Sequence, residues 1–478
     1  MEEYVKRLPL ALVVMSLGFA QSPFLEQKST AVASIDAHAQ ELARLSDQVW
    51  AHAETAFRET RSSEALASYA AAQGFRVRRG IAEMPTAFIA EYGRGSPVIG
   101  VLGEYDALPG ISQKAEPVKA PLEPGAGGHG CGHNLLGVGA LGAAVAIKEQ
   151  MAAGKIAGMI RFYGTPAEEM GGGKLYMVRA GLFTDVDIIL SWHPGDENNA
   201  DTQSSQAMVD FIVEFQGKTA HAAFDPWNGR SAVDGLEIFT QSLNYLREHV
   251  KPTVRMHYTI VDGGKVPNVV PDYAKLWCWV RDSDRTGVED VMRRVRKIVE
   301  GSALSADVGA KLTVQIGYYN MLVNMAGQRL LFANLQWLGP LKFTAAEQEF
   351  ARQIQKATGT EPAGLDEAIK PFLENPGPPE GGSTDVADVS WNVPTLQLTT
   401  TTAPKAAPWH AWPVVACGGM SIGHKGMTYA AKVLASTMVD LLNDPAKRAE
   451  IRKEFAEKVA GKPYQGYVPD GPPPIPKR

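Results

Sequence analysis

A short glycine-rich stretch holds the residues of this sequence that are best suited to metal chemistry. Residues 125–135 read GAGGHGCGHNL and place Cys131 and His133 one residue apart, in a chain of 478 residues with only three cysteines and ten histidines. Thiolate and neutral imidazole are strong ligands of transition metals. Both side chains can reach one site only where the backbone is bent or extended, which the neighbouring glycines permit. Taken alone, the stretch is also compatible with a glycine-rich turn that holds a buried cysteine and a capping histidine.

Three more residues of the right chemistry follow strand-like apolar runs. Glu168 and Glu169 come after one such run, and His193 lies in a Trp-His-Pro sequence after the next. Adjacent carboxylates in a loop point in different directions, so one can bind a metal while the other takes a proton from an activated water. On its own, a Glu-Glu pair is more typical of a solvated helix N-terminus, and a lone Trp-His-Pro of a packed histidine. Their coincidence with the cysteine and histidine above favours a catalytic metal centre.

The elements that must position these residues alternate between strands and helices. Over the first 200 residues this alternation predicts an α/β domain with a mixed, largely parallel sheet. The polar groups fall just after strands, at the edge where open α/β sheets bind ligands. After Ala200 the order becomes β-α-β-β-α-β, which predicts an inserted ferredoxin-like α+β domain. The predicted boundaries are 1–20 for a signal peptide, 21–201 and 327–462 for the catalytic domain, 202–326 for the inserted domain and 463–478 for a Pro-rich tail.

Composition and charge narrow the class of protein. The chain is 45% apolar and 21% charged with a net charge of −5, which is ordinary for a soluble globular protein. Nothing indicates a nucleic-acid partner or an anionic membrane. Lys6 and Arg7 precede an apolar run over residues 8–20, which is shorter than the roughly 20 residues that span a bilayer. The run fits a cleavable secretory signal, so we expect a periplasmic or secreted protein, or a cytoplasmic one if the segment is not cleaved.

From residue 36 to residue 442 the sequence resembles the M20 family of metallopeptidases and amidohydrolases. The motifs that carry the resemblance are GEYDALPG, GHGCGHN, TPAEE, WHP, GKTAHAA, GGKVPNVVPD, GGSTDVADVSW and IGHKGM. The resemblance implies a two-metal centre. The implied metal ligands are Cys131, His133, Glu169, His193 and a last histidine, which is His410 or, as the alternative, His424. We expect His410, because the last ligand of the family lies in a loop before the final helix.

The same resemblance assigns the catalytic and substrate-binding roles. Glu168 matches the general base, and Asp106 matches an acid that orients a ligand imidazole. The inserted domain is implied to serve as a lid and in dimerisation, with His221 stabilising the oxyanion, often across a dimer. Asn268 and Arg281 match positions that hold the substrate carboxylate or carbonyl. Without the resemblance, these three would be an exposed loop histidine, a turn residue and a strand-end ion-pairing residue.

The implied activity is hydrolysis of the amide bond of N-acyl amino acids such as p-aminobenzoyl-glutamate, by a metal-activated water and a glutamate base. The implied cofactors are two divalent ions per chain, zinc or manganese, with cobalt also possible. We expect a small-molecule substrate and a homodimer, or a heteromer with a related chain. The alternatives are a two-metal aminopeptidase or carboxypeptidase acting on small peptides, and a non-catalytic metal-binding partner subunit. A chain that had lost catalysis would be expected to lack Glu168 or a ligand, and all of them are present.

Overall fold

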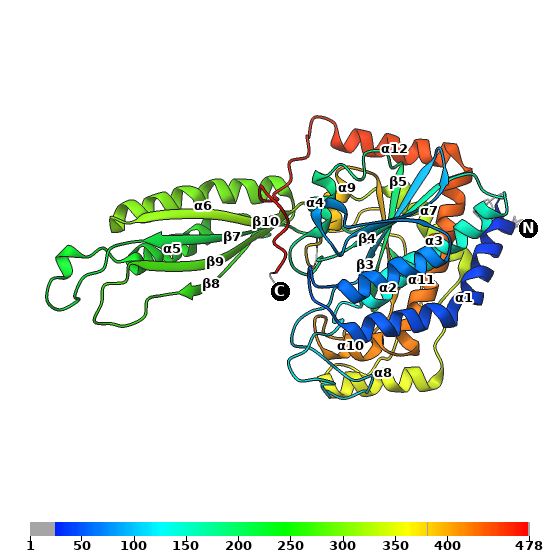
Figure 1. Cartoon of the computed structure of the whole chain (residues 1–478), viewed down its shortest axis with the longest axis horizontal. Helices are drawn as coiled ribbons and strands as arrows, with labels where there is room; N and C mark the ends of the chain where they lie inside the picture. The colour runs from blue at the N-terminus through cyan, green and yellow to red at the C-terminus, as the bar shows by residue number, and fades with distance from the viewer. Residues whose placement is uncertain (1–23, 380, 477–478) are drawn as a thin grey trace, which may run out of the picture.

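Two β-sheets organise the chain, and Figure 1 shows them in two units that lie end to end. The structure is a computed structural model that describes residues 24–379 and 381–476. The predicted signal peptide, residues 1–20, lies outside the described residues. The larger unit holds a seven-stranded sheet, and the smaller, inserted unit holds a four-stranded sheet. This arrangement confirms the predicted fold class.

The seven-stranded sheet has a parallel centre and antiparallel edges. In spatial order its strands are β1 (Arg76–Arg79), β2 (Phe88–Arg94), β4 (Gly158–Thr165), β3 (Val98–Glu104), β5 (Ile188–Gly195), β11 (Thr395–Thr401) and β6 (Asn199–Ala200). Strands β4, β3, β5 and β11 are parallel to one another, whereas β1, β2 and β6 pair antiparallel with their neighbours. The four parallel strands therefore direct their carboxyl ends to one edge of the sheet.

Helices cover both faces of this sheet. On one face, α1 (Leu25–His52), α2 (Thr60–Ala72), α3 (His133–Ala152) and α11 (Ser421–Asn443) pack around a shared apolar core. On the other face lie the short helices α4 (Gly173–Arg179) and α9 (Val386–Ser390). Of the described helices, α3 alone is long and apolar enough to cross a membrane, but 78% of its apolar window is buried inside the protein, as in a core helix.

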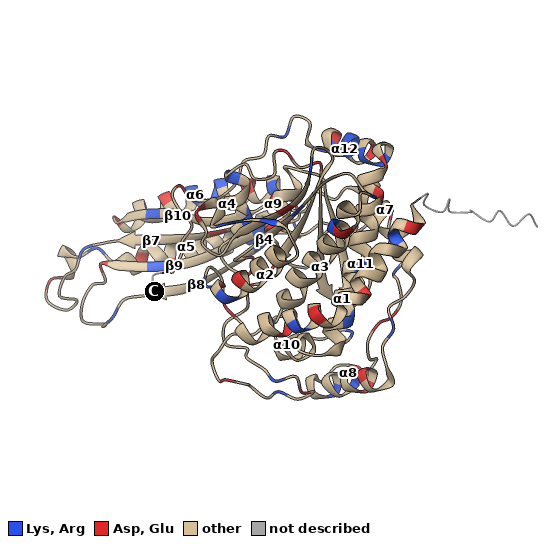
Figure 2. Ribbon diagram, turned by 45° about the vertical axis from the view of Figure 1, so that its right-hand side comes forward, with Lys and Arg blue, Asp and Glu red and all other residues tan. Residues whose placement is uncertain are grey.

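The described part of the larger unit has five further helical segments. They are α7 (Met325–Leu338), α8 (Ala345–Thr358), α10 (Trp412–Gly418), α12 (Pro445–Val459) and the single turn η1 (Ile81–Glu83). Helix α8 begins with a capping box, in which Thr344 and Glu347 each bond the backbone of the other. Figure 2 shows basic and acidic residues mixed along α8 and α12.

The inserted unit is the predicted β-α-β-β-α-β fold. Its elements are β7 (Ala207–Gln216), η2 (Pro226–Asn228), α5 (Ala232–Leu246), η3 (Arg247–His249), β8 (Arg255–Asp262), β9 (Tyr273–Asp282), α6 (Arg285–Ala306) and β10 (Gly309–Tyr318). The strand order is β10-β7-β9-β8, and every pair is antiparallel. Alternate residues of β7 and β9, such as Phe211 and Cys278, are buried against α5 and α6. No helix of the inserted unit covers the opposite face of the sheet among the described residues, and Leu175 of α4 packs against Met208 at one end of it.

The C-terminal segment crosses from one unit to the other. The sequence predicts an extended surface segment, and the segment is extended, but it is packed at the junction of the units. The backbone N–H of Gly317 on β10 donates to the carbonyl of Tyr467 at 2.9 Å, and the guanidinium of Arg285 lies 3.3 Å from the centre of the Tyr467 ring. Further along, Pro474 and Pro476 line a cavity of about 390 Å³ beside Glu169.

Candidate metal centre

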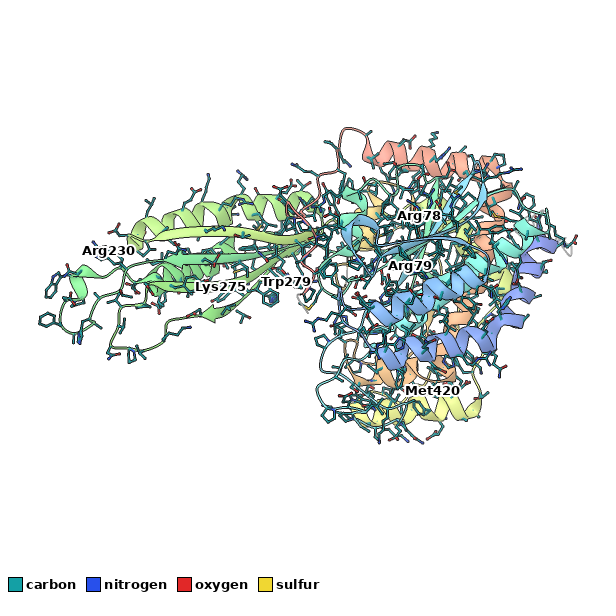
Figure 3. All side chains as sticks on the ribbon, in the orientation of Figure 1. Arg78, Arg79, Arg230, Lys275, Trp279 and Met420 are labelled. Atoms are coloured by element: carbon teal, nitrogen blue, oxygen red, sulfur yellow. The ribbon has the colours of Figure 1, made fainter. Side chains whose placement is uncertain are left out.

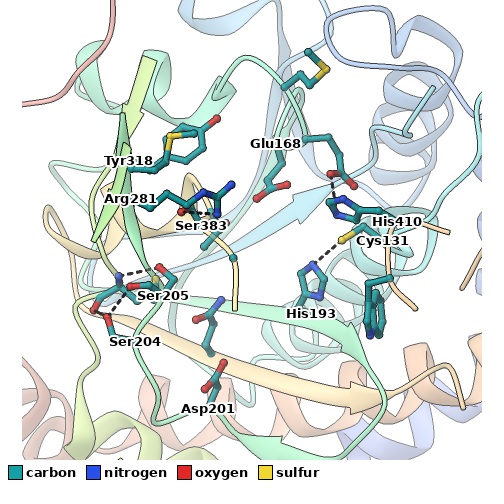
Figure 4. A pocket seen from close by; sticks show the side chains of 18 of the residues that line it. Cys131, Glu168, His193, Asp201, Ser204, Ser205, Arg281, Tyr318, Ser383 and His410 are labelled. Carbon is teal, nitrogen blue, oxygen red and sulfur yellow. Dashed lines mark hydrogen bonds and ion pairs between the residues drawn. The ribbon is translucent and has the colours of Figure 1, made fainter. Parts of the chain in front are cut away.

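The predicted metal ligands and catalytic acids meet at the edge of the sheet where the parallel strands end. We call this edge the metal edge. Asp106 follows β3, and Glu168 and Glu169 follow β4. His193 lies near the end of β5, and His410 lies in the loop after β11. Cys131 and His133 reach the same edge from the start of α3. A cavity of about 540 Å³ opens here, and its wall includes Cys131, Glu168, Glu169, His193 and His410 (Figure 4). Cys131 and His410, which are 279 positions apart in the sequence, thus line one cavity.

The glycine between Cys131 and His133 has a steric role. Gly132 has a φ of +76°, and a Cβ at this position would lie 2.9 Å from Pro194, beside the His193 ligand position. A side chain here would be strained and would push the two loops apart. The backbone is thus bent at Gly132, and the thiol of Cys131 and the imidazole of His133 lie in one group of possible ligands. The Cys131 Sγ lies 3.4 Å from Nε2 of His193.

Two groups of potential ligand atoms share the cysteine. Cys131, His133 and His193 form one group, and Cys131, Glu169 and His410 form the other. Within each group the ligand atoms lie within 4.8 Å of one another. A thiolate common to both groups could serve two neighbouring metal ions. His424, the alternative last ligand, lies on α11, where its Nε2 is 2.8 Å from Asp47, and it does not line the cavity.

The tautomers of the two inner histidines leave a lone pair free for a metal. Nδ1 of His133 donates to Asp106 at 2.9 Å, and Nδ1 of His193 donates to the carbonyl of Pro194 at 2.7 Å. In each ring Nε2 then carries the lone pair. Nε2 of His133 and Oε1 of Glu169 are buried atoms without a hydrogen bond. Buried, unbonded and convergent donor atoms fit a bound cation, so the site can hold metal.

Burial of negative charge dominates the electrostatics of the site. Burial, reinforced by Glu104 and Asp385, raises the pKa of Glu168 well above its usual range. Burial also raises the pKa of Glu169 to about 7 and raises that of the Cys131 thiol. Bound divalent cations would offset the free-energy cost of burying these groups in their ionised form, because a cation favours the ionised form of every ligand. The chain by itself holds more negative charge at this edge than it neutralises.

A buried ionic group behind the site is absent from the sequence predictions. Nζ of Lys174, on α4, lies 2.7 Å from Glu104 and 2.7 Å from Asp385, and none of the three side chains is exposed to more than 2%. The backbone N–H of Lys174 also donates to the carboxylate of Asp385, at 3.0 Å. Glu104 in turn lies 3.2 Å from Nε2 of His133. The one available sequence signal is a lysine among glycines, and its partner Asp385 is 211 residues away.

The substrate-binding residues predicted in the inserted unit are divided between its two ends. Arg281 lies at the end of β9 nearest the metal edge, lines the cavity and lies 3.4 Å from the hydroxyl of Ser383. His221 and Asn268 lie together beyond the far ends of β7 and β9, where the carbonyl of Asn268 accepts from Ala222. The structure therefore brings Arg281 to the metal edge, whereas His221 and Asn268 of the same chain do not reach it.

Comparison with known proteins gives the same fold and indicates the family. A model of the peptidase dimerisation domain of M20 proteins matches residues 204–307, within the inserted unit. The chain is 37% identical over 470 residues to one of the subunits of p-aminobenzoyl-glutamate hydrolase from Escherichia coli K12, and the match covers 93% of this chain and 98% of that protein. It is 28% identical to the human Xaa-Arg dipeptidase over 459 residues, or 91% and 93% of the two chains.

A solved structure supports these sequence matches. A Bacillus subtilis protein described as a dinuclear metal binding peptidase from the M20 family has a TM-score of 0.59 and 19% identity, covering 85% of this chain and 99% of that one. At this identity the structural match shows the fold, while the Escherichia coli protein matches nearly the whole sequence. Both units take part, since both matches extend across the insertion. We conclude that this chain is a hydrolase that belongs to the M20 family of metal-dependent peptidases and amidohydrolases.

Proposed function

We propose that the chain is a two-metal amidohydrolase that cleaves the amide bond of N-acyl amino acids, with p-aminobenzoyl-glutamate as the first candidate substrate. The observation that carries the proposal is the pair of ligand groups that share Cys131, with the carboxylate of Glu168, which belongs to neither of these two groups, in the same cavity. This choice of substrate is supported by the 37% identity to a subunit of p-aminobenzoyl-glutamate hydrolase. Thiolate favours zinc, while imidazole and carboxylate also accept manganese or cobalt.

Glu168 is the group that moves the proton. When bound, the divalent ions would polarise the amide carbonyl and lower the pKa of a water. The Glu168 carboxylate lies in the cavity wall and is not one of the five proposed ligands, so it is free to take the proton of the attacking water. The same carboxyl then returns the proton to the amide nitrogen, which leaves as an amine. The buried setting of Glu168 favours its protonated state between these two transfers.

The oxyanion donor in this proposal comes from a second copy of the chain. Nδ1 of His221 accepts a hydrogen bond from the backbone N–H of Phe224 at 3.0 Å, so its ring proton is on Nε2. That N–H is available to donate to an amide oxygen that gains negative charge. His221 does not reach the cavity of its own chain, and the match to a dimerisation domain supports delivery by a partner copy. Arg281 would pair with the substrate carboxylate.

The test is amine release from p-aminobenzoyl-glutamate and other N-acyl amino acids by metal-loaded protein. The matched control is Glu168→Gln, which preserves the size of the side chain and removes the base. We expect turnover in the original protein and a loss of roughly 10²–10⁴-fold in kcat for the variant, with two metal ions per chain still bound in both. Turnover that survives the substitution would contradict the role of Glu168. Absence of bound metal would contradict the two-metal centre.

A further inference from the structure

The open face of the inserted sheet forms one wall of the metal-site cavity. Asp210 of β7 and Trp277, Trp279 and Arg281 of β9 line the same cavity as the proposed ligands. Figure 3 shows Trp279 at the end of the inserted unit near the larger unit, with Arg230 at the opposite tip. A substrate bound at the metal edge therefore faces this wall. The metal chemistry does not use Asp210 or the tryptophans.

Asp210 is a buried carboxylate that faces the cavity and has no cationic partner. Only 7% of its surface is exposed, and its Oδ1 accepts a hydrogen bond from Nε1 of Trp277 at 2.6 Å. No lysine, arginine or histidine among residues 24–379 and 381–476 forms an ion pair with it. Burial raises its pKa to about 6, while hydrogen bonds from Trp277 and Trp279 oppose this rise. An ionised carboxylate offers about four acceptor positions, so these two bonds leave room for a further N–H donor.

The tryptophans supply a flat surface next to this carboxylate. The Trp277 ring is 37% exposed and meets the Trp279 ring edge-on, with centroids 6.4 Å apart. The Arg281 guanidinium already lies over Trp279, 5.0 Å from its centroid. Trp277 thus keeps an exposed aromatic face, fixed by its hydrogen bond to Asp210. Such a face stacks well with aromatic rings and with guanidinium groups.

The wall therefore carries a cation and an unpaired carboxylate a short distance apart. Asp210 pairs with Trp279 in the sheet, and Arg281 is two residues further along β9, so their backbones are roughly 7 Å apart along the strand direction. This pattern suits a ligand with a carboxylate at one position and an N–H donor at another. A ligand with two carboxylates and no donor would place negative charge near Asp210.

We propose that Asp210 and Trp277 form a specificity subsite for a planar substrate group that bears N–H donors, while Arg281 takes the substrate carboxylate. This inference rests on the proposed function and specifies its substrate class. Two groups share the required chemistry: an arylamine, as in an aminobenzoyl group, and a guanidinium, as in an arginine side chain. The subsite stacks the planar group on Trp277 and accepts its N–H at Asp210.

The test compares substrates with and without the N–H donor. One arm pairs p-aminobenzoyl-glutamate with benzoyl-glutamate, and the other pairs benzoyl-arginine with benzoyl-norleucine, whose side chain has no N–H. We expect kcat/KM to favour the donor-bearing member of one pair by about tenfold or more, and the arm that shows the preference identifies the source. In Asp210→Asn, which keeps the shape of the side chain, we expect this preference to fall to about threefold or less.

A neighbouring acid provides the matched control. Glu214 lies on the same face of β7, further from the metal edge, where it accepts a hydrogen bond from Tyr273 at 2.6 Å, and it does not line the cavity. Glu214→Gln should leave the preference intact. Equal kcat/KM within both pairs in the original protein, or a preference that persists in Asp210→Asn, would overturn the subsite.

A binding measurement separates this inference from the proposed function. If none of the four amides is hydrolysed, the proposed function fails, but calorimetric affinities for the same four compounds still decide the subsite. Tighter binding of a donor-bearing compound, lost in Asp210→Asn and kept in Glu214→Gln, would support it. Equal affinities within both pairs would overturn it. Hydrolysis without donor preference would leave the proposed function standing and remove the subsite alone.

Discussion

The metal edge and the far tip of the inserted unit are built in opposite ways. At the metal edge, His133 is fully buried and held by Asp106 at 2.9 Å, and every proposed ligand comes from the same chain. At the tip, His221 is exposed and its ring bonds only to the backbone of its own loop. One chain thus brings its proposed metal ligands together by itself, whereas in the proposed function the histidine that donates to the oxyanion is positioned by another copy.

The largest expected effect comes from the ligand that both groups share. Cys131→Ala should reduce bound metal from about two ions per chain to less than one and lower turnover by roughly 10³-fold, because it removes a donor from both groups at once. Metal content by elemental analysis, measured beside turnover, checks this. Cys417→Ala is the control, since Cys417 is also fully buried but does not line the cavity. If Cys131→Ala still binds two ions per chain, the thiolate of Cys131 is not a ligand that both metal ions share.

The second prediction concerns the support behind the metal edge. Lys174→Met would leave Glu104 and Asp385 buried without their cation, and we expect it to lower the free energy of unfolding by about 3–5 kcal/mol. Lys342→Met breaks an exposed ion pair with Glu367 and should cost about 1 kcal/mol or less. Urea unfolding of both variants gives the comparison. Similar losses in the two would mean that the buried group does not stabilise the edge.

The third prediction tests whether the tip acts in a second copy. His221→Ala should lower kcat by roughly 10²–10³-fold, as expected for loss of one oxyanion donor, with metal content and unfolding unchanged. Mixing it with Glu168→Gln should restore activity, because a mixed dimer has one site with an intact base and an intact histidine. Random exchange in a dimer would restore about a quarter of the original activity. No recovery after confirmed exchange of chains would place His221 outside the partner's site.

The smallest effect is expected from an orienting residue at the metal edge. Asp106→Asn keeps an acceptor for His133 but removes its charge, so metal affinity should fall about 10–100-fold while the fold is kept. Competition with a chelator measures this affinity. Asp388→Asn is a control at a buried aspartate that bonds Tyr464 and Tyr319 and is not part of the metal edge. Equal losses in both variants would contradict a specific orienting role for Asp106.

The metal edge could be predicted from the sequence because its residues stand in short motifs that directly follow predicted strands. Cys131 and His133 stand in one motif, and Glu168 and Glu169 in another, so parallel strand order is enough to bring them together. The buried bond between Lys174 and Asp385 carries no such signal, because it joins residues that only tertiary folding makes neighbours. Asp210 likewise looks like an exposed strand residue, and only the position of the inserted sheet over the cavity reveals what it faces.

The C-terminal segment changes how the inserted unit can move. Residues 201–206 and 319–324 connect the two units, and the segment that carries Tyr467 adds a third link, which Arg179 anchors through the carbonyls of Pro469 and Gly471. Three segments of the chain, and not only the two that enter and leave the insertion, therefore link the inserted unit to the larger unit. Any rotation must stretch or release this strap, whose far end borders the loop of Glu169. A shift of the inserted unit would therefore displace a segment that borders the cavity beside Glu169.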